Sequence, residues 1–327
     1  MDRKRKAIIA GNQVSRLSTY RLGGYEQKVL LDGKSEKNPI LIFLHGGPGT
    51  PIPFSAGSRG MFPQFTKQCI LVCWDQLGCG INNHNIDDSF TVEQFVDMTV
   101  DLIRAVKKEF PDNPVNLFGV SWGSVLAAKT AIRVPELLNR VLVYGQVLKK
   151  LTFNDDVYDV LKQADVSARV RMQIENMFGK EEHTAADLKQ AAGWIRKYTE
   201  GYQVRKGSNL PIGKVIGGLL ASPDYSLKDV KAIVLNGYLH NQSLLNEMME
   251  IDLSQELRQV QVPYLIMQGD RDIVTPTKAV ERLMTEEHTD KLFFSLVENS
   301  AHMPSANAME RIQTEGISFL KKEGYAE

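Results

Sequence analysis

The chain has 327 residues, of which 43% are hydrophobic and 24% are charged. This composition is typical of a globular protein that is large enough for one sizeable core and an accessory domain. The 39 basic side chains are balanced by 39 acidic ones, so the formal net charge is zero. A neutral chain lacks the positive surplus that binding to nucleic acid or an anionic membrane requires, and we expect neither as a partner.

A short basic stretch opens the chain, in residues 1–13 (MDRKRKAIIAGNQ), but only four apolar residues follow it. A secretory signal needs an apolar stretch of roughly 7–15 residues. The longest apolar run, at residues 40–44 (ILIFL), is also far shorter than the ~20 residues of a membrane span. We therefore expect a soluble, cytoplasmic protein.

Three cysteines lie close together, at Cys69, Cys73 and Cys79. The first two lie in a predicted strand, where four residues cover about 13 Å, whereas a disulfide needs Cα atoms within about 7 Å. No other Cys or His has the spacing of a zinc ligand relative to them. We expect buried thiols, and neither a metal nor another cofactor.

Strand and helix patterns alternate along most of the chain. The first 40 residues contain segments of alternating polarity, which predict antiparallel strands at one edge of a sheet. Helical spacing follows some of the later strands, as at residues 91–110, and this alternation predicts a doubly wound α/β domain. Six short apolar runs predict strands that are buried on both faces, at residues 38–46, 69–76, 114–121, 139–147, 262–270 and 291–299.

One segment interrupts this alternation. Between about Leu148 and Leu253 no run predicts a buried strand, and helical patterns occupy residues 166–179, 185–202 and 226–251. We interpret it as a helical insertion over the sheet. The predicted division is a core of residues 1–147, a helical cap of residues 148–253, and a second part of the core at 254–327.

The motif Gly-x-Ser-x-Gly occurs at residues 119–123, within the stretch GVSWGS. It arises by chance in roughly one chain of this length in ten, so its context must decide. Ser121 lies where a predicted strand meets a predicted helix, the sharp turn that exposes a serine Oγ at the carboxyl edge of a sheet. A side chain at Gly119 or Gly123 would collide with neighbouring elements. This context favours Ser121 as a nucleophile.

A serine nucleophile needs a histidine base that a carboxylate holds in place. Asp270 and Asp272 follow the strand predicted at 262–270, and His302 follows the strand predicted at 291–299. Both loops lie at the carboxyl ends of strands, where open α/β sheets bind ligands, and the order Ser, Asp, His is the expected one. One of the two aspartates is expected to cap the helix that begins near Pro276.

A glycine-rich loop follows the strand predicted at 38–46 and reads LHGGPGTP, residues 44–51. Successive glycines let backbone N–H groups approach a tetrahedral intermediate, so we expect an oxyanion hole here. The expected donors are the N–H of Trp122 and that of Gly46 or Gly47. A phosphate-binding loop is the alternative, but no Lys-Ser/Thr pair follows at the required spacing.

Five motifs together resemble the proline iminopeptidase branch of the α/β-hydrolases: HGGPG, WDQLGCG, GVSWGS, GDRDIVTP and SAHMP. The resemblance covers roughly residues 20–147 and 254–325. It implies an α/β-hydrolase fold, a mostly parallel sheet flanked by helices, with the helical cap inserted after the sixth core strand. It also implies that Ser121 is the nucleophile, His302 the base and Asp272 the orienting acid, with Asp270 a bystander.

The chain departs from the family pattern at two places. The family has Asp-Gln-Arg-Gly after the fourth core strand, whereas Leu77 here replaces the arginine. The family also binds the substrate ammonium with cap carboxylates, often in a Trp-x-x-Trp-Glu stretch, and residues 193–202 here (GWIRKYTEGY) match it only at altered spacing. The candidate carboxylates are Glu175, Glu200, Asp224 and Glu247.

The predicted function is that of a serine hydrolase, a proline iminopeptidase-like aminopeptidase that releases amino-terminal residues from small peptides. A carboxylesterase, lactonase or amidase on a small acyl substrate is the first alternative, and a non-catalytic ligand receptor on the same scaffold the second. A serine at residue 121 argues against epoxide hydrolase and dehalogenase chemistry, which uses a carboxylate nucleophile. The sequence leaves the oligomeric state unknown.

Overall fold

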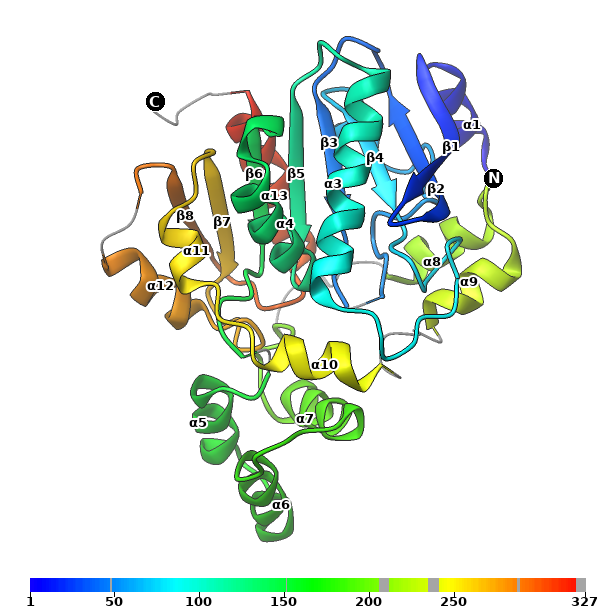
Figure 1. Ribbon diagram of the computed structural model, residues 1–327. Helices are drawn as coiled ribbons and strands as arrows, with labels where there is room; N and C mark the ends of the chain where they lie inside the picture. The colour runs from blue at the N-terminus through cyan, green and yellow to red at the C-terminus, as the bar shows by residue number, and fades with distance from the viewer. Residues whose placement is uncertain (48, 151, 206–211, 235–240, 287–288, 322–327) are drawn as a thin grey trace.

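A single eight-stranded sheet organises the protein (Figure 1). The computed structural model describes residues 1–47, 49–150, 152–205, 212–234, 241–286 and 289–321. The strand order is β1-β2-β4-β3-β5-β6-β7-β8. The strands are β1 (Val14–Leu22), β2 (Tyr25–Gly33), β3 (Ile40–Leu44), β4 (Ile70–Trp74), β5 (Val115–Val120), β6 (Arg140–Tyr144), β7 (Tyr264–Gly269) and β8 (Leu292–Val297).

The direction of the strands confirms the predicted sheet. Strands β3 to β8 pair in parallel, and each lies within one of the six apolar runs. Strands β1 and β2 pair with each other in antiparallel fashion, and β2 pairs antiparallel with β4, at the edge expected for the first 40 residues. With its flanking helices this is the fold class that the sequence predicts, a mostly parallel α/β sheet.

Helices cover both faces of the sheet, and each face has an apolar core. Side chains of β3 alternate between the two cores: Ile40 and Ile42 pack with α3 and α4, whereas Leu41 and Phe43 pack on the face that α2 and α13 cover. These helices, with α1 at the amino end and α12 between β7 and β8, have the following bounds: α1 (Arg3–Ala10), α2 (Pro63–Thr66), α3 (Val92–Glu109), α4 (Trp122–Arg133), α12 (Thr277–Thr285) and α13 (Ala306–Leu320).

The chain between β6 and β7 is helical. Within the described residues it contains α5 (Asp155–Gln163), α6 (Ala168–Phe178), α7 (Ala185–Tyr198), α8 (Ile212–Leu220), α9 (Leu227–Val234), α10 (Gln242–Met249) and α11 (Ser254–Arg258). In Figure 1, α5, α6, α7 and α10 lie below the carboxyl edge of the parallel strands, and α8 and α9 lie near α1. We call residues 148–253 the helical segment; its status as a separate domain stays a prediction.

Several helices differ from the predicted ones. Helices α1, α5 and α8 have no counterpart in the prediction, and the helix predicted over 226–251 consists of α9 and α10, with residues 235–240 outside the described residues. Helix α1 could not be predicted because it is stabilised by contacts with remote parts of the chain. Its apolar content is low, but Arg5 is buried and donates to the carbonyl oxygens of Gly57 (2.9 Å) and Gly218 (2.6 Å).

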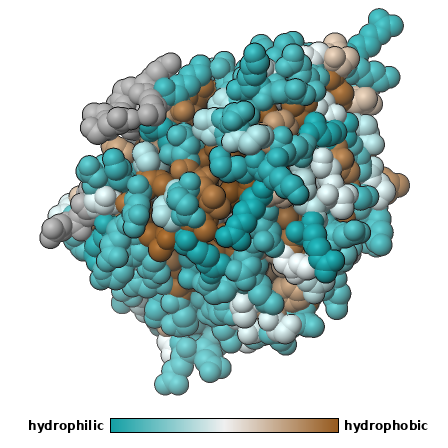
Figure 2. All heavy atoms as spheres, turned by 45° about the horizontal axis from the view of Figure 1, so that its top comes forward, coloured by the Kyte–Doolittle hydropathy of each residue, from teal (hydrophilic) through white to brown (hydrophobic). Residues whose placement is uncertain are grey.

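Hydrophilic residues cover most of the face seen in Figure 2, and the largest group of hydrophobic atoms lies near its centre. This distribution is ordinary, since much of any folded protein surface is apolar. None of the helices in the described part of the chain has the length and hydrophobicity that a membrane span requires.

Candidate active site

Ser121 occupies the turn between β5 and α4. Its backbone has φ 51° and ψ −121°, a conformation that non-glycine residues rarely adopt. Its N–H donates to the carbonyl oxygen of Tyr144 on β6 (3.1 Å), and its own carbonyl oxygen accepts from the hydroxyl of Ser124 (2.6 Å). Such strain persists only where the surroundings hold it, and it is typical of a nucleophile elbow.

The two glycines of the motif allow this turn to pack closely. A Cβ on Gly123 would lie 1.9 Å from the carbonyl oxygen of Leu44, and one on Gly119 would lie 2.6 Å from the carbonyl oxygen of Gly123. Both contacts are with backbone atoms, which cannot move aside as a flexible side chain can. The predicted reason for the flanking glycines is therefore correct.

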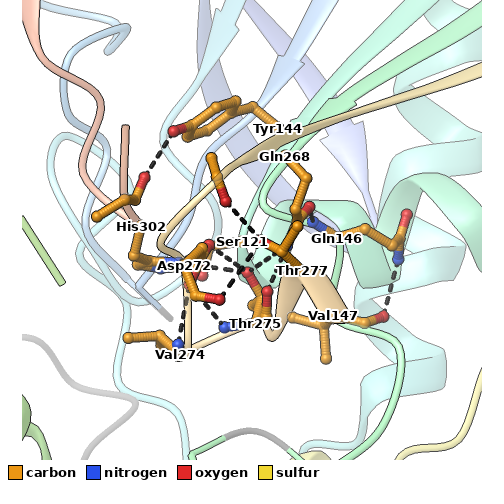
Figure 3. A network of polar contacts seen from close by, with 12 residues as sticks. Ser121, Tyr144, Gln146, Val147, Gln268, Asp272, Val274, Thr275, Thr277 and His302 are labelled. Carbon is orange, nitrogen blue, oxygen red and sulfur yellow. Dashed lines mark hydrogen bonds and ion pairs between the residues drawn. The ribbon is translucent and has the colours of Figure 1, made fainter. Parts of the chain in front are cut away.

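Asp272 and His302 are in direct contact. The Nδ1 of His302 lies 2.9 Å from Oδ2 of Asp272, and the carboxylate is completely buried, whereas the imidazole is 12% exposed. Figure 3 shows Ser121, Asp272, Thr275 and His302 gathered at one place. The turn after β6 lies against the same pair, because a Cβ on Gly145 would be 3.5 Å from Cε1 of His302 and 3.6 Å from Oδ2 of Asp272.

The carboxylate of Asp272 is held by its own loop. Oδ1 accepts from the N–H groups of Val274 (2.8 Å) and Thr275 (3.0 Å), and Oδ2 accepts from the Thr275 hydroxyl (2.7 Å). These bonds leave Oδ2 directed at His302, so the imidazole proton is fixed on Nδ1 and Nε2 is left as an acceptor. Asp272 thus contacts His302 through Oδ2 and accepts through Oδ1 the N–H groups that precede α12.

Asp270 bonds to a different residue of the same loop, and not to His302. Its Oδ1 accepts from the N–H of Ser300, 2.9 Å away, in the loop that carries His302. Asp270 therefore joins the loop after β7 to the loop that carries His302, and its expected absence from the reaction stays a prediction. The expectation that one of the two aspartates caps α12 is wrong, because the N-cap is Pro276 with no side-chain hydrogen bond, and Asp272 accepts instead from the N–H groups of Val274 and Thr275 before the helix.

The proposed oxyanion donors lie next to Ser121. A Cβ on Gly46 would be 3.2 Å from the Cβ of Ser121, and Gly47 has φ 120°, a region that favours glycine. Trp122 is the first residue of α4, and the first N–H groups of a helix have no partner within the helix. Two loops thus bring backbone donors beside the hydroxyl-bearing carbon.

A buried network connects these two loops. The Gln76 N–H donates to Nε2 of His45 (3.0 Å), its side-chain nitrogen donates to the His45 carbonyl oxygen (3.2 Å), and its side-chain oxygen accepts from the Trp122 indole (2.9 Å). Nδ1 of His45 lies 2.9 Å from the Gly46 carbonyl oxygen, so it carries the proton. Burial lowers the pKa of His45 to about 4, which keeps the ring neutral.

Comparison with known proteins agrees with this geometry. The alpha/beta hydrolase fold family matches residues 39–306, which is more than half of the chain. The chain belongs to the alpha/beta hydrolase fold family. It is also similar to a probable aminopeptidase, YbaC, of Bacillus subtilis (strain 168), with 23% identity over 296 residues that cover 86% of this chain and 89% of the relative.

Further relatives of this hydrolase carry the name proline iminopeptidase. One from Heyndrickxia coagulans is 24% identical over 300 residues, which cover 86% of this chain and 90% of that protein. The crystal structure of a proline iminopeptidase from Mycobacterium smegmatis superimposes with a TM-score of 0.65 at 18% identity, covering 94% of this chain and 98% of that one. The resemblance drawn from the five motifs is confirmed, and the structural likeness supports the fold.

The loop after β4 is held without the family arginine. Leu77 is completely buried in the core that also contains α3 and α4. Asp75 accepts from the N–H of Ile81 (2.9 Å), and the side-chain nitrogen of Asn82 donates to the carbonyl oxygens of Asp75 (2.7 Å) and Lys28 (2.8 Å). Side chains within the loop therefore keep it against the sheet of this hydrolase.

Three of the four candidate carboxylates in the helical segment have partners. Glu200 forms an ion pair with Arg271, Asp224 forms one with Arg59, and Oε2 of Glu247 accepts from the N–H of Val92 at the start of α3 (2.8 Å). The fourth, Glu175, is exposed on α6. An ammonium ligand at any of the paired three would have to share the carboxylate with its present partner or displace it.

Sequence reasoning assigned no role to His45, Gln76 or Thr275. His45 lies in the motif HGGPG and Gln76 in the motif WDQLGCG, so both residues belong to the family pattern. Their hydrogen-bond partners cannot be found from the motifs because they are remote in sequence: Gln76 and Trp122 are 46 residues apart. Within the described residues no group of three or more His, Cys, Asp or Glu side chains is arranged to hold a metal ion.

Proposed function

We propose that this hydrolase acts by acyl transfer with Ser121 as nucleophile, His302 as general base and Asp272 as orienting acid. The contact that carries the proposal is the 2.9 Å approach of the His302 Nδ1 to the buried Asp272 carboxylate, beside a strained serine turn. An imidazole held in this tautomer offers Nε2 to a serine hydroxyl.

In the proposed reaction, Ser121 Oγ attacks the substrate carbonyl while His302 accepts its proton. The Asp272 carboxylate stabilises the resulting imidazolium, and the N–H groups of Trp122 and of Gly46 or Gly47 bind the oxyanion. His302 then donates the proton to the leaving group. Water, activated by the same imidazole, releases the acyl group and restores Ser121.

We further propose that the substrate is a small peptide with a free amino terminus. Support comes from the names of the relatives, which include a probable aminopeptidase and several proline iminopeptidases. A second candidate, an esterase or amidase on a small acyl substrate, is favoured by the partners that Glu200, Asp224 and Glu247 already have. An esterase requires no carboxylate for an ammonium group.

The test is hydrolysis of prolyl-naphthylamide and its N-acetylated form, with a short acyl nitrophenyl ester alongside. Cleavage of the free-amine amide alone would establish an aminopeptidase, whereas cleavage of the ester alone would establish the second candidate. Ser121→Ala should lower kcat by about 10⁴–10⁶ on whichever substrate reacts, and should abolish labelling by a fluorophosphonate. Near-normal turnover by this variant would refute the mechanism.

A further inference from the structure

In the loop that carries His302, the two residues before the histidine, Ser300 and Ala301, are hydrogen-bonded to the core of the protein. The Tyr144 hydroxyl donates to the carbonyl oxygen of Ala301 (2.6 Å), and the N–H of Ser300 donates to Asp270 (2.9 Å). Tyr144 and Asp270 belong to β6 and to the loop after β7, so this half of the loop is fixed by the sheet. None of these contacts reaches the backbone of His302 itself.

The next two N–H groups donate to the helical segment instead. The N–H of His302 donates to the carbonyl oxygen of Gly201 (3.3 Å), and that of Met303 donates to the carbonyl oxygen of Tyr202 (2.7 Å). The Tyr202 ring also lies 6.1 Å from the imidazole, centre to centre. The proposed base therefore depends, for its backbone position, on residues about a hundred positions earlier in the chain.

Residues 200–202, which we call the 200–202 turn, follow Thr199, the C-cap residue of α7, and are held in place by contacts with that helix. The Gly201 N–H donates to the Thr199 hydroxyl (3.0 Å), which in turn donates to the carbonyl oxygen of Ile195 on α7 (2.7 Å). The guanidinium of Arg196 lies 4.2 Å from the centre of the Tyr202 ring. The turn is therefore an extension of α7, and a shift of that helix would carry the turn with it.

The turn also touches the loop of the orienting acid. Glu200 forms an ion pair with Arg271, the residue before Asp272. A Cβ on Gly201 would lie 2.1 Å from Cγ1 and 3.1 Å from Cβ of Ile273, the residue after Asp272. Gly201 is buried and its φ lies outside the left-handed region, so this glycine is required by close packing and not by backbone strain.

We propose that the 200–202 turn is a positioning element for the Asp272–His302 pair, through which the helical segment controls the alignment of the base. This inference rests on the proposed function, since it assigns the turn a task in the same reaction. Gly201 touches no reacting atom; it acts by holding the His302 N–H and by packing against Ile273. Displacement of a base by about 1 Å costs on the order of 10²-fold in rate, so a displaced turn should slow the chemical step.

The test compares Gly201→Ala with Gly193→Ala. The second is a matched control on α7, since a Cβ there would meet no atom within 4 Å. For Gly201→Ala we expect kcat, and the rate of Ser121 labelling by a fluorophosphonate, to fall about tenfold to a hundredfold, while KM changes less than about threefold. We also expect a shifted midpoint in the pH dependence of kcat, because the base changes its surroundings. Gly193→Ala should match the wild type in all four measurements.

A second pair of variants separates positioning from general damage. Ile273→Ala removes Cγ1 and Cδ1, the two atoms closest to the new methyl group (2.1 and 2.6 Å), and keeps only Cβ at 3.1 Å, so adding Gly201→Ala to it should cost less than about threefold in kcat. Equal losses of kcat in both backgrounds would overturn the proposal. So would an unchanged rate, labelling and pH profile in a folded Gly201→Ala protein.

Failure of the proposed function and failure of the Gly201→Ala protein to fold can each be recognised separately. If the wild type is neither labelled nor active, the proposed function fails before the turn is tested. If Gly201→Ala does not fold, Glu200→Gln takes its place, because it removes the charge that pairs with Arg271 and keeps a side-chain oxygen that can accept from the N–H of Arg205. It should lower kcat about twofold to tenfold with a shifted pH midpoint, and wild-type kinetics in this variant would overturn the proposal.

Discussion

The side chain of Gln76 accepts a hydrogen bond from the Trp122 indole, with the two atoms 2.9 Å apart. Gln76 and Trp122 are both completely buried, so neither group can turn to water instead. Since Gln76 also donates to the carbonyl oxygen of His45, it joins the glycine-rich loop to the start of α4. These are the two sources of the proposed oxyanion donors, which the pairing of β3 with β5 brings side by side, and the Gln76 amide adds a hydrogen-bonded link between them.

Gln76→Met should therefore impair the chemical step more than substrate binding. The thioether keeps the length of the side chain but loses both hydrogen bonds. Removal of a whole oxyanion donor costs about 10²–10³ in kcat, and a displaced donor should cost less, so we expect a fall of about tenfold to a hundredfold with KM within threefold. Steady-state kinetics on the reactive substrate of the wild type measure both quantities.

The control for this variant is Asn116→Leu. Asn116 is equally buried, and its side chain donates to the carbonyl oxygen of Ile40 at the opposite end of β5 and β3. Both variants should lose about 1–3 kcal/mol of unfolding free energy, but only Gln76→Met should lower kcat. A Gln76→Met protein with wild-type kcat would show that the amide has no part in the oxyanion hole.

Asp272→Asn and Asp270→Asn should differ by several orders of magnitude. An asparagine at 272 can present its N–H₂ to His302, which reverses the tautomer, and this change costs about 10⁴ in kcat in a serine triad. Asp270 holds only the Ser300 N–H, so its replacement should cost no more than about tenfold. Single-turnover acylation rates compare the two variants directly. Equal losses would mean that the acid has been assigned to the wrong residue.

The sequence predicts the sheet well because the sheet depends on local patterns, and the same patterns explain why the three residues of the proposed triad lie at one edge of it. Each parallel strand is a short apolar run, and Ser121, Asp272 and His302 each follow such a run within a few residues. The parallel arrangement then brings the three loops to one edge. This part of the prediction does not require knowledge of which remote residues contact one another.

The supporting contacts could not be predicted because their partners are far apart in sequence. Asp224 and Arg59 are 165 residues apart, and Arg5 donates to Gly218, which is 213 residues away. A carboxylate in a polar helix has the same sequence pattern whether it is solvated, ion-paired or bound to substrate. For this reason the sequence does not distinguish Glu200 and Asp224 from Glu175 as candidate ligands of a substrate ammonium group, although their surroundings in the structure differ.

Two buried groups should give the stability of the protein opposite pH dependences. Burial raises the pKa of Asp75 to about 6, although the Tyr225 hydroxyl donates to it, and burial lowers the pKa of His45 to about 4. The folded protein keeps the Asp75 proton that the unfolded chain releases near 3.8, so this contribution is complete below that pH and is lost as the pH rises through 6. The His45 contribution has the opposite sign, since stability falls as the pH drops from 6.5 to 4.

Asp75→Asn should remove the pH dependence of stability that Asp75 causes and leave the one that His45 causes. At about 1.4 kcal/mol per pKa unit, each group changes the free energy of unfolding by about 3 kcal/mol across its range. Between pH 4 and pH 6, which covers part of this range, we expect the unfolding free energy of the variant to rise with pH by about 2 kcal/mol more than that of the wild type. Urea unfolding at half-unit pH intervals tests this. Parallel curves would mean that Asp75 has an ordinary pKa.

Asp224→Asn should weaken the fold without changing substrate choice. Asp224 forms its ion pair with Arg59 (Nε to Oδ2, 2.9 Å) at a site where both side chains are mostly buried, and it adjoins Tyr225, which donates to Asp75. Breaking a buried pair costs about 3–5 kcal/mol, and an asparagine that keeps part of the hydrogen bonding should cost about 2–3 kcal/mol in urea unfolding.

Glu175→Gln is the control for this variant, because Glu175 is exposed on α6 and its replacement should change the unfolding free energy by less than about 0.5 kcal/mol. The ratio of rates on a free-amine amide and its acetylated form should stay within twofold of the wild type in both variants. If Asp224→Asn instead abolished the preference for a free amine while the protein kept its stability, the carboxylate would be a substrate ligand. The ammonium group would then either displace Arg59 or share the carboxylate with it, because an ionised carboxylate has two oxygens that can each accept more than one hydrogen bond.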